Sequence, residues 1–548
     1  MTTAFEISDE LTERWADSDP INATTYGIGG RDHLCTDYSP EGHERRAALY
    51  REMRDRLSAF CTDDDPIESF AARVMTGWLA EQVEEHDAGK WRRDLNHVYS
   101  PFQVTRDVFD VMDRETAAGW ADIDARLRGI GEALEGYRLS LEEGLAVGDT
   151  AAARQVVSLL EQLDAAASDQ SRFISFIGQA ENAEANTESL QEAVDQTRAS
   201  CAKFGEWLRD AYLPRARRSD AVGRDEYLRE ADVHLGLTID PEATYEWGWD
   251  EVRRLREEMA TTSAMIDPDR SVDEVIELLD TDPTRAAATR DEFVEFVSDI
   301  QQQAIEQLAG GHFEVADELR TVTVNIAPPG GSLGAWYVPP AEDFSRPGSI
   351  WYAPGERQLL PYWQEVSTAY HEGFPGHHLQ VGTVLLERDN LSRFQRSVVW
   401  YSGAGEGWAL YAERLMDELG FFEAPEYRLG LLASQLFRST RVVVDIGCHL
   451  QLAIPDHAPL RAGETWTYEA AVDYVEHVGL QPHDVAVSEV LRYLGWPGQA
   501  ISYKVGEREI LAMRDRAMGS PEFEMKDFHR RMLAAGAIRL DQLAEEMA

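Results

Sequence analysis

Residues 370–380 read Tyr370-His371-Glu372-Gly373-Phe374-Pro375-Gly376-His377-His378-Leu379-Gln380, which places three imidazoles and a carboxylate within eight residues. Immediately upstream, apolar side chains recur at spacings of 3, 4 and 4 residues, at Trp363, Val366, Tyr370 and Phe374. This periodicity is that of one face of an α-helix, and Pro361 suits the first turn of such a helix. The pattern therefore predicts a helix that carries His371 and Glu372.

The histidine spacing departs from the motif His-Glu-x-x-His, in which two histidines four residues apart share a zinc ion while the glutamate activates its water. His377 lies six residues after His371, about 9 Å along an ideal helix and on a different face. His378 returns to the same face but lies about 10 Å away. In a regular helix, neither of them binds the same ion as His371.

Two residues interrupt this helix. Pro375 has no amide hydrogen to donate to the carbonyl of His371 and clashes with it, while Gly376 tolerates unusual backbone angles. We therefore expect a bulge that absorbs two residues and lets His371 and His377 converge on one metal ion, with His378 as the second choice. The alternative is that His371 caps a broken helix and that His377 and His378 begin the next one.

The third metal ligand is expected from a later segment, which reads Gly403-Ala404-Gly405-Glu406-Gly407-Trp408-Ala409-Leu410-Tyr411-Ala412-Glu413. Glu406 and Glu413 are seven residues apart and so share one face of a predicted helix. A zinc site with two imidazoles and an open position commonly takes a carboxylate as its third ligand, and we predict Glu406 for it. Glu413 is predicted to orient a ligand histidine. Alternatively, both are ordinary solvated glutamates.

A polar stripe runs along the apolar segment 431–449, where Arg438, Arg441, Asp445 and His449 follow one another at spacings of 3, 4 and 4 residues. Buried charges are costly unless they are paired or face water, and the wall of an active site meets both conditions. We predict that Arg441 binds a substrate carboxylate and that His449 helps to stabilise developing charge, with Arg438 and Asp445 beside them. A buried Arg–Asp bridge without a chemical role explains the stripe nearly as well.

The segment Gly495-Trp496-Pro497-Gly498-Gln499-Ala500-Ile501-Ser502-Tyr503-Lys504 breaks the chain and starts another helix. Gln499 and Tyr503 are four residues apart on one face of it. A phenol near a polarised carbonyl is a suitable donor to an oxyanion, so we predict this role for Tyr503 and a substrate contact for Gln499. Alternatively, Tyr503 anchors the C-terminal helices.

The fold is predicted to be mainly α, with helical periodicity from about residue 5 to 315 and long helices over residues 117–167 and 181–211. Short strands are expected at 321–326, 335–338 and 349–353, with Pro328-Pro329-Gly330-Gly331 breaking the first. Such a sheet would hold an extended peptide by main-chain pairing, or cover the helices as a ribbon, so that Tyr337 and Tyr352 point into a cleft or pack. We expect an N-terminal lobe at 1–315 and a metal-binding lobe at 316–548, or one continuous domain.

The charge balance excludes several kinds of partner. The 99 acidic residues exceed the 52 lysines and arginines by 47, which favours adaptation to a high-salt cytoplasm, or an acidic partner-binding surface. It argues against nucleic acid and anionic membranes as partners. The four scattered cysteines contain no Cys-x-x-Cys, and neither a signal segment nor an apolar run of 18 residues is visible, so a cytoplasmic location is expected.

Together the four motifs resemble the prokaryotic family of domain-of-unknown-function 885. They are His371-Glu372-x-x-Pro375-Gly376-His377-His378-x-Gln380, Glu406 to Glu413, Arg441 to His449 and Pro497 to Tyr503. That family in turn looks like a distant relative of the helical zinc peptidases that include thermostable metallocarboxypeptidases, thimet oligopeptidase and angiotensin-converting enzyme. This resemblance implies an elongated, two-lobed helical molecule with a deep cleft.

The resemblance also implies roles for single residues. The zinc helix of those peptidases reads His-Glu-x-Gly-His, so Gly376-His377 matches its second half with two residues inserted, which ranks His377 above His378. Their third ligand is a downstream glutamate, which matches Glu406, and a late tyrosine assists the oxyanion, which matches Tyr503.

The sequence thus predicts a zinc-dependent hydrolase of short peptides, a carboxypeptidase or oligopeptidase. Zn²⁺, with Co²⁺ or Mn²⁺ as alternatives, would be bound by His371, His377 and Glu406, and Glu372 would act as general base on its water. The alternatives are a zinc hydrolase of a non-peptide amide or ester, and an inactive helical peptide-binding protein. The oligomeric state, including a homodimer, stays open.

Overall fold

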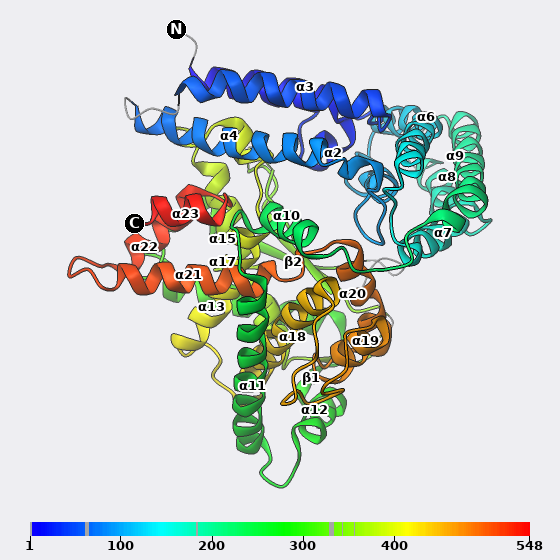
Figure 1. The fold of residues 1–548 in the computed structure, drawn as a ribbon. Helices are drawn as coiled ribbons and strands as arrows, with labels where there is room; N and C mark the ends of the chain where they lie inside the picture. The colour runs from blue at the N-terminus through cyan, green and yellow to red at the C-terminus, as the bar shows by residue number, and fades with distance from the viewer. Residues whose placement is uncertain (1–2, 61–64, 182–184, 328–333, 342–343, 356) are drawn as a thin grey trace. The chain divides into compact units, whose positions relative to one another are not determined.

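The computed structural model describes residues 3–60, 65–181, 185–327, 334–341, 344–355 and 357–548, and these form a mainly helical protein with small sheets (Figure 1). The predicted chain break at Pro328-Pro329-Gly330-Gly331 lies outside the described residues. The chain divides into two compact units.

The first unit comprises Met1–Ala221 with the short segments Ser392–Val399 and Leu494–Trp496. Its helices are α1 (Ala4–Ser18), α2 (Pro20–Thr25), α3 (Pro40–Leu57), α4 (Pro66–Asp87), α5 (Pro101–Asp107), α6 (Ala117–Val147), α7 (Ala153–Ala167), α8 (Ser175–Glu181), α9 (Thr187–Trp207) and α16 (Arg393–Ser397). Its core includes the buried residues Trp120 and Leu127 of α6, Leu163 of α7 and Phe204 of α9.

The long helices predicted for this unit are only partly correct. The helix expected at 117–167 is divided into α6 and α7, because Gly148 adopts a left-handed conformation with φ of 77° and ends α6. The helix expected at 181–211 is represented by α9, which passes into a π-helical turn at Leu208–Tyr212.

The second unit comprises Val222–Leu391, Trp400–Tyr493 and Pro497–Ala548 and holds every predicted site residue. Its helices are α10 (Arg224–Leu235), α11 (Pro241–Ile266), α12 (Val272–Thr281), α13 (Arg290–Leu308), α14 (Glu365–Glu372), α15 (His377–Leu386), α17 (Ser402–Glu418), α18 (Pro425–Leu450), α19 (Tyr468–His477), α21 (Ser502–Ala517), α22 (Met525–Ala535), α23 (Leu540–Glu546) and most of α20 (His483–Gly495).

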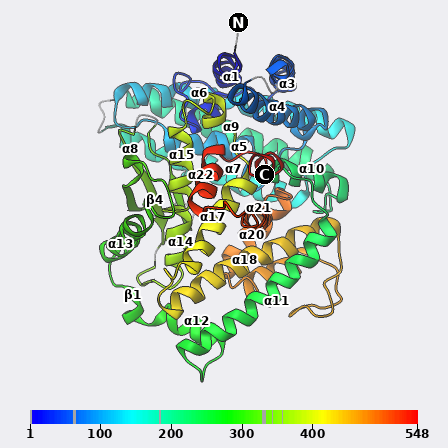
Figure 2. The same ribbon diagram turned by 90° about the vertical axis from the view of Figure 1, so that its left-hand side faces the viewer.

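The division between the units falls at residue 221 and not at the expected 315. The reason is α11, which packs along most of α18 (Figure 1, Figure 2). In this contact Gly248 lies against Val442 and Val443, whose side chains fill the space that a Cβ at residue 248 would take. The helices between 222 and 315 therefore belong to the same core as the predicted metal-binding residues.

The predicted strands are present in the second unit. β2 (Val322–Ile326) pairs in parallel with β4 (Gly348–Ala353), which pairs antiparallel with β3 (Gly334–Val338). A smaller antiparallel pair joins β1 (Ala286–Ala287) to β5 (Leu360–Pro361). Helix α13 covers the three-stranded sheet, and Tyr352 packs edge-on against Phe293 at 5.0 Å between ring centroids (Figure 2). Tyr352 is therefore a core residue of this sheet.

Helices α17 and α21 cross with their backbones in direct contact. A Cβ placed on Gly407 would lie 2.5 Å from the carbonyl carbon of Gly506, and a Cβ on Gly506 would lie 2.0 Å from the carbonyl oxygen of Gly403. Because no side chain separates the two helices, Glu406 on α17 and Tyr503 on α21 are held close to one another.

Candidate metal centre

The chain leaves the helical path between the two histidines. α14 ends at Glu372 and α15 begins at His377, so the bulge predicted within one continuous helix is wrong and a full break takes its place. The break needs glycine, because a Cβ on Gly376 would lie 2.0 Å from the carbonyl oxygen of His371. His377 does begin a new helix, as the alternative interpretation held.

The loop between α14 and α15 is fixed by side chains from two other helices. Gln301 on α13 accepts a hydrogen bond from the amide of Phe374 at 2.6 Å and donates one to the carbonyl of Ala369 at 2.7 Å. Trp408 on α17 donates from its indole nitrogen to the carbonyl of Pro375 at 2.9 Å. The loop therefore keeps one conformation despite its two glycines.

The break brings the two imidazoles together at one carboxylate. His371 Nε2 lies 3.3 Å from Glu406 Oε2, and His377 Nε2 lies 3.6 Å from the same oxygen. The ring centroids are 4.9 Å apart, and the ligand atoms of all three residues lie within 4.8 Å of one another. We call His371, His377 and Glu406 the triad.

The triad fits a small divalent cation. Ligands of a tetrahedral zinc ion lie about 2.0–2.1 Å from the metal and hence about 3.3 Å from each other. The two nitrogen–oxygen distances of 3.3 and 3.6 Å match this spacing and exceed the length of a charge-assisted hydrogen bond. Glu406 Oε2 is buried and makes no hydrogen bond within the described part of the chain. Two imidazoles and a carboxylate are a donor set typical of zinc.

The other nitrogen of each ring is already used. His371 Nδ1 lies 2.7 Å from Glu413 Oε1, and the second oxygen of Glu413 accepts a hydrogen bond from Ser367 at 2.6 Å. His377 Nδ1 lies 3.4 Å from Gln380 Oε1. Because a carboxylate and an amide oxygen accept, each Nδ1 carries the proton and each Nε2 presents its lone pair to the triad.

The electrostatics of the triad favour a cation. Burial opposes charge on His371, but the neighbouring carboxylates Glu406 and Glu413 outweigh it and raise the pKa of His371 to about 9. Burial would raise the pKa of Glu406, yet both histidines hold it well below its usual range. The two carboxylates therefore favour positive charge at the triad.

Glu372 stands beside the triad on the last turn of α14. Burial raises the pKa of Glu372, against the opposing effect of His371 and His377. Its carboxylate makes no hydrogen bond or ion pair within the residues that the structure describes. A carboxylate with a raised pKa and free oxygens beside a metal site has the properties of a general base.

The second-choice ligand, His378, is not part of the triad. Its Nε2 donates to the carbonyl of Leu319 at 3.0 Å, and its Nδ1 lies 3.0 Å from the hydroxyl of Tyr337. Burial lowers the pKa of His378 to about 4, so the ring is neutral. Both nitrogens are occupied, and Tyr337 holds this ring instead of facing the triad.

Two arginines of the predicted stripe lie next to Tyr503. The guanidinium carbons of Arg441 and Arg438 lie 4.6 and 5.9 Å from the centre of its ring. Burial raises the pKa of Tyr503, and the charge of Glu406 adds to the shift, so this phenol keeps its proton. Tyr503 therefore lies near Glu406 of the triad, and Arg438 and Arg441 lie against the ring of Tyr503.

A family model described as "Bacterial protein of unknown function (DUF885)" matches residues 20–547. The chain belongs to the DUF885 family. The comparison with curated proteins gave no significant match.

Two solved structures share the fold. One is a protein from Colwellia psychrerythraea described as a candidate lipoprotein, with 23% identity and a TM-score of 0.85 over 99% of this chain and 98% of the other. The second is a candidate lipoprotein of unknown function from Shewanella oneidensis, with 17% identity and a TM-score of 0.75 over 100% and 99% of the two chains. In this DUF885 chain, no helix of the described residues has the length and apolarity needed to cross a bilayer.

The polar stripe of the DUF885 chain is divided between two surroundings. Asp445 and His449 have no exposed surface, and Asp445 accepts hydrogen bonds from Tyr227 at 2.8 Å and from the Gly498 amide at 3.0 Å. His449 Nε2 donates to the carbonyl of Tyr493 at 3.0 Å. The predicted role of His449 in charge stabilisation is therefore wrong, because a side chain without exposed surface does not contact a substrate.

Gln499 is also a supporting residue. Its side-chain oxygen accepts a hydrogen bond from Arg492 on α20, and only 6% of its surface is exposed. The oxygen of Gln499 therefore orients an arginine, and its contact with a substrate stays a prediction.

Sequence reasoning missed three residues that shape this site. Gln301 fixes the loop and Ser367 holds Glu413, but neither stands out in the sequence. Glu489 binds two arginines, and its spacing of 3 and 4 residues from Arg492 and Tyr493 is a signal that could have found it.

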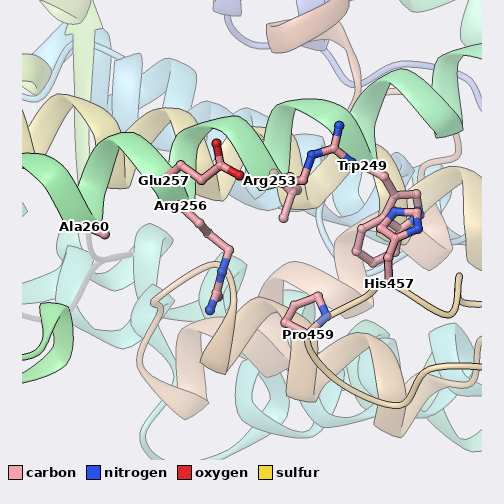
Figure 3. A pocket seen from close by; sticks show the side chains of 8 residues that line it. Trp249, Arg253, Arg256, Glu257, Ala260, His457 and Pro459 are labelled. Atoms are coloured by element: carbon pink, nitrogen blue, oxygen red, sulfur yellow. The ribbon is translucent and has the colours of Figure 1, made fainter.

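A separate cavity of about 290 Å³ contains none of the predicted residues (Figure 3). Trp249 and His457, both labelled in Figure 3, line it with their ring centroids 6.1 Å apart and their planes edge to face. Its lining residues are Trp249, Val252, Arg253, Arg256, Glu257, Ala260, His457 and Pro459.

Proposed function

We propose that this DUF885 chain is a zinc-dependent hydrolase of short peptides, a carboxypeptidase or oligopeptidase. The observation that carries the proposal is the buried Glu406 oxygen, which makes no hydrogen bond and lies 3.3 and 3.6 Å from two imidazole nitrogens. The resemblance to helical zinc peptidases, with their deep cleft, is part of the same proposal.

His371, His377 and Glu406 would hold the ion. A bound divalent cation supplies two things in such sites, a water of lowered pKa and polarisation of a carbonyl oxygen. Glu413 keeps the His371 ring oriented, and Gln380 does so for His377. These supporting contacts exist in the protein itself, so the ligand geometry is set before any ion arrives.

Glu372 would take the proton from the attacking water and pass it to the leaving amine. Its raised pKa suits both directions of this transfer, because the ideal value lies near the working pH. Tyr503 keeps its phenolic proton and would donate it in a hydrogen bond to the oxygen on which negative charge develops.

The test replaces Glu372 by glutamine, which has the same shape but no basicity. We expect peptide hydrolysis by Glu372→Gln to fall by about 10²–10⁴-fold while metal content stays that of the wild type. Turnover is measured by mass spectrometry on a mixture of short peptides, and metal by plasma mass spectrometry, both in about 1 M salt.

Glu295→Gln is the matched control, because Glu295 is an exposed glutamate on α13. It should leave turnover unchanged. A Glu372→Gln protein as active as the wild type, or a wild type that acts only on esters or non-peptide amides, would overturn the proposal.

A further inference from the structure

Two arginines share the carboxylate of Glu489, and a third arginine lies one turn away on α18. Arg441 Nη2 lies 3.0 Å and Arg492 Nη2 lies 2.8 Å from the same oxygen of Glu489, which also accepts a hydrogen bond from Tyr493 at 2.6 Å. Despite burial, the arginines lower the pKa of Glu489 to about 2, so it stays ionised. Two guanidinium groups therefore share a single negative charge.

Arg438, one turn before Arg441 on α18, adds a third positive charge. The nearest carboxylate oxygen to it is Oε1 of Glu413, 3.9 Å from its Nη2, and that oxygen already binds His371. Glu372 also faces the charge of Arg438, but among the described residues neither Glu372 nor Glu413 lies within hydrogen-bond distance of this guanidinium.

Hydrogen-bond donors in the cluster are also unused. Arg441 Nη1 and Arg438 Nε are buried and have no acceptor among the described residues. Buried donors are nearly always satisfied in folded proteins, so these two are available to an acceptor that reaches the cluster. The side chains keep 10% and 17% of their surface exposed, so a ligand reaches them with a small movement.

Aromatic rings hold the guanidinium groups in place. The Arg441 guanidinium carbon lies 4.3 Å from the centre of the Phe437 ring and 4.6 Å from that of Tyr503. Its Nε donates to the hydroxyl of Tyr493 at 3.2 Å. A preorganised arginine of this kind binds a planar carboxylate at little entropic cost.

We propose that Arg438 and Arg441 bind the free C-terminal carboxylate of the substrate, which makes the protein a carboxypeptidase and not an endopeptidase. This inference rests on the proposed function. Arg438 borders Glu413, which also contacts His371 of the triad, so a carboxylate held here belongs to a substrate that also reaches the triad.

The test compares the binding of matched peptides to metal-free protein, so that its result does not depend on hydrolysis. Calorimetry is done in about 1 M salt, where the Debye length is about 3 Å and general repulsion is screened. The probes are a tetrapeptide with a free C-terminus, its C-terminal amide, and an amidated peptide that ends in glutamate. We expect the wild type to bind the free acid about 10- to 100-fold more tightly than either amide.

Arg441→Met should bind the free acid about 10- to 100-fold more weakly and the amides unchanged, and Arg441→Lys should recover part of the loss. Arg438→Met tests the same point with less risk to folding, because Arg438 has no close carboxylate partner. Arg428→Met is the control, since Arg428 lies on the same helix and pairs with Glu258 and Asp417.

Equal binding of the free acid and its amide by the wild type would overturn the inference. Equally tight binding of the amidated glutamate peptide would overturn the C-terminal assignment, because the cluster would then recognise any carboxylate. An active Glu372→Gln protein would refute the proposed function alone and would leave this binding preference intact.

Discussion

Two imidazole–carboxylate pairs in the second unit differ in what surrounds them. His371 Nε2 lies 3.3 Å from Glu406, and His449 Nε2 lies 3.6 Å from Asp445. The side chain of Glu406 is 18% exposed, whereas Asp445 and His449 are completely buried. In the first pair Nε2 has a free lone pair, because Nδ1 binds Glu413, while in the second pair Nε2 donates to a backbone carbonyl.

The difference shows that the distance between a histidine and a carboxylate does not identify a metal site. What matters is whether the ring nitrogen that faces the carboxylate is free. Glu406 Oε2 and Asp445 Oδ1, the oxygens nearest the two rings, both accept no hydrogen bond within the described residues, but His449 Nε2 already donates to the carbonyl of Tyr493. The first pair is arranged for a cation and the second for structural support.

The largest expected effect distinguishes the neighbouring histidines His377 and His378. His377→Ala should abolish metal binding. The loss of metal affinity should exceed the about 100-fold loss that follows from removing a residue that only orients a ligand. His378→Gln should keep the metal and cost about 1–3 kcal/mol of stability, because it disturbs two buried hydrogen bonds.

Metal content by plasma mass spectrometry and urea unfolding check both variants. Metal loss in His378→Gln with retention in His377→Ala would reverse the assignment of ligands.

A smaller effect is expected at the residue that orients His371. Glu413→Gln keeps the size of the side chain but removes the charge that accepts the Nδ1 proton, so metal affinity should fall about 10- to 100-fold. Competition with a fluorescent chelator measures it. Glu295→Gln serves as the control, and unchanged affinity in Glu413→Gln would mean that the triad is held without this carboxylate.

The smallest expected effect concerns the buried pair of His449 and Asp445. Burial raises the pKa of Asp445 from its ordinary 3.8 to about 7, although Tyr227, the Gly498 amide and Arg492 oppose the shift. A raised folded-state pKa gives stability that is complete below the unfolded value and is lost as the pH rises through the folded one. As the pH rises from 5 to 8, the free energy of unfolding of Asp445→Asn should therefore increase by about 2 kcal/mol relative to that of the wild type.

Urea unfolding of both proteins across this pH range measures the gain. A constant difference between them would show that Asp445 is ionised at all these pH values. The comparison removes the contributions of other carboxylates, since they are common to both proteins.

Local patterns in the sequence predicted most of the second unit. The strands at β2, β3 and β4 follow from alternating side chains, and the helix with His371 and Glu372 follows from its apolar stripe. The group of His371, His377 and Glu406 was also reached from the sequence, where the interruption at Pro375-Gly376 allowed the two rings to converge and the resemblance to helical zinc peptidases ranked His377 above His378.

Tertiary contacts decided the rest. A full break replaces the expected bulge because Gln301 and Trp408, 68 and 33 residues from their partners in the chain, supply the hydrogen bonds that hold the loop. His449 was expected in the site because it shares a helical face with Arg441, but its turn of α18 is covered by Tyr227. Periodicity identifies a face and does not tell which neighbour covers it.

The hydrogen bonds from Gln301 also limit how the histidine motif can be used in protein engineering. A peptide of residues 365–386 carries both histidines, but the partners that hold its loop belong to α13 and α17. Such a peptide transplanted into another helical scaffold would lose the turn that lets the rings meet. Transfer of this candidate metal centre to a new host needs the equivalents of four helices, α13, α14, α15 and α17, with glutamine and tryptophan at matching positions.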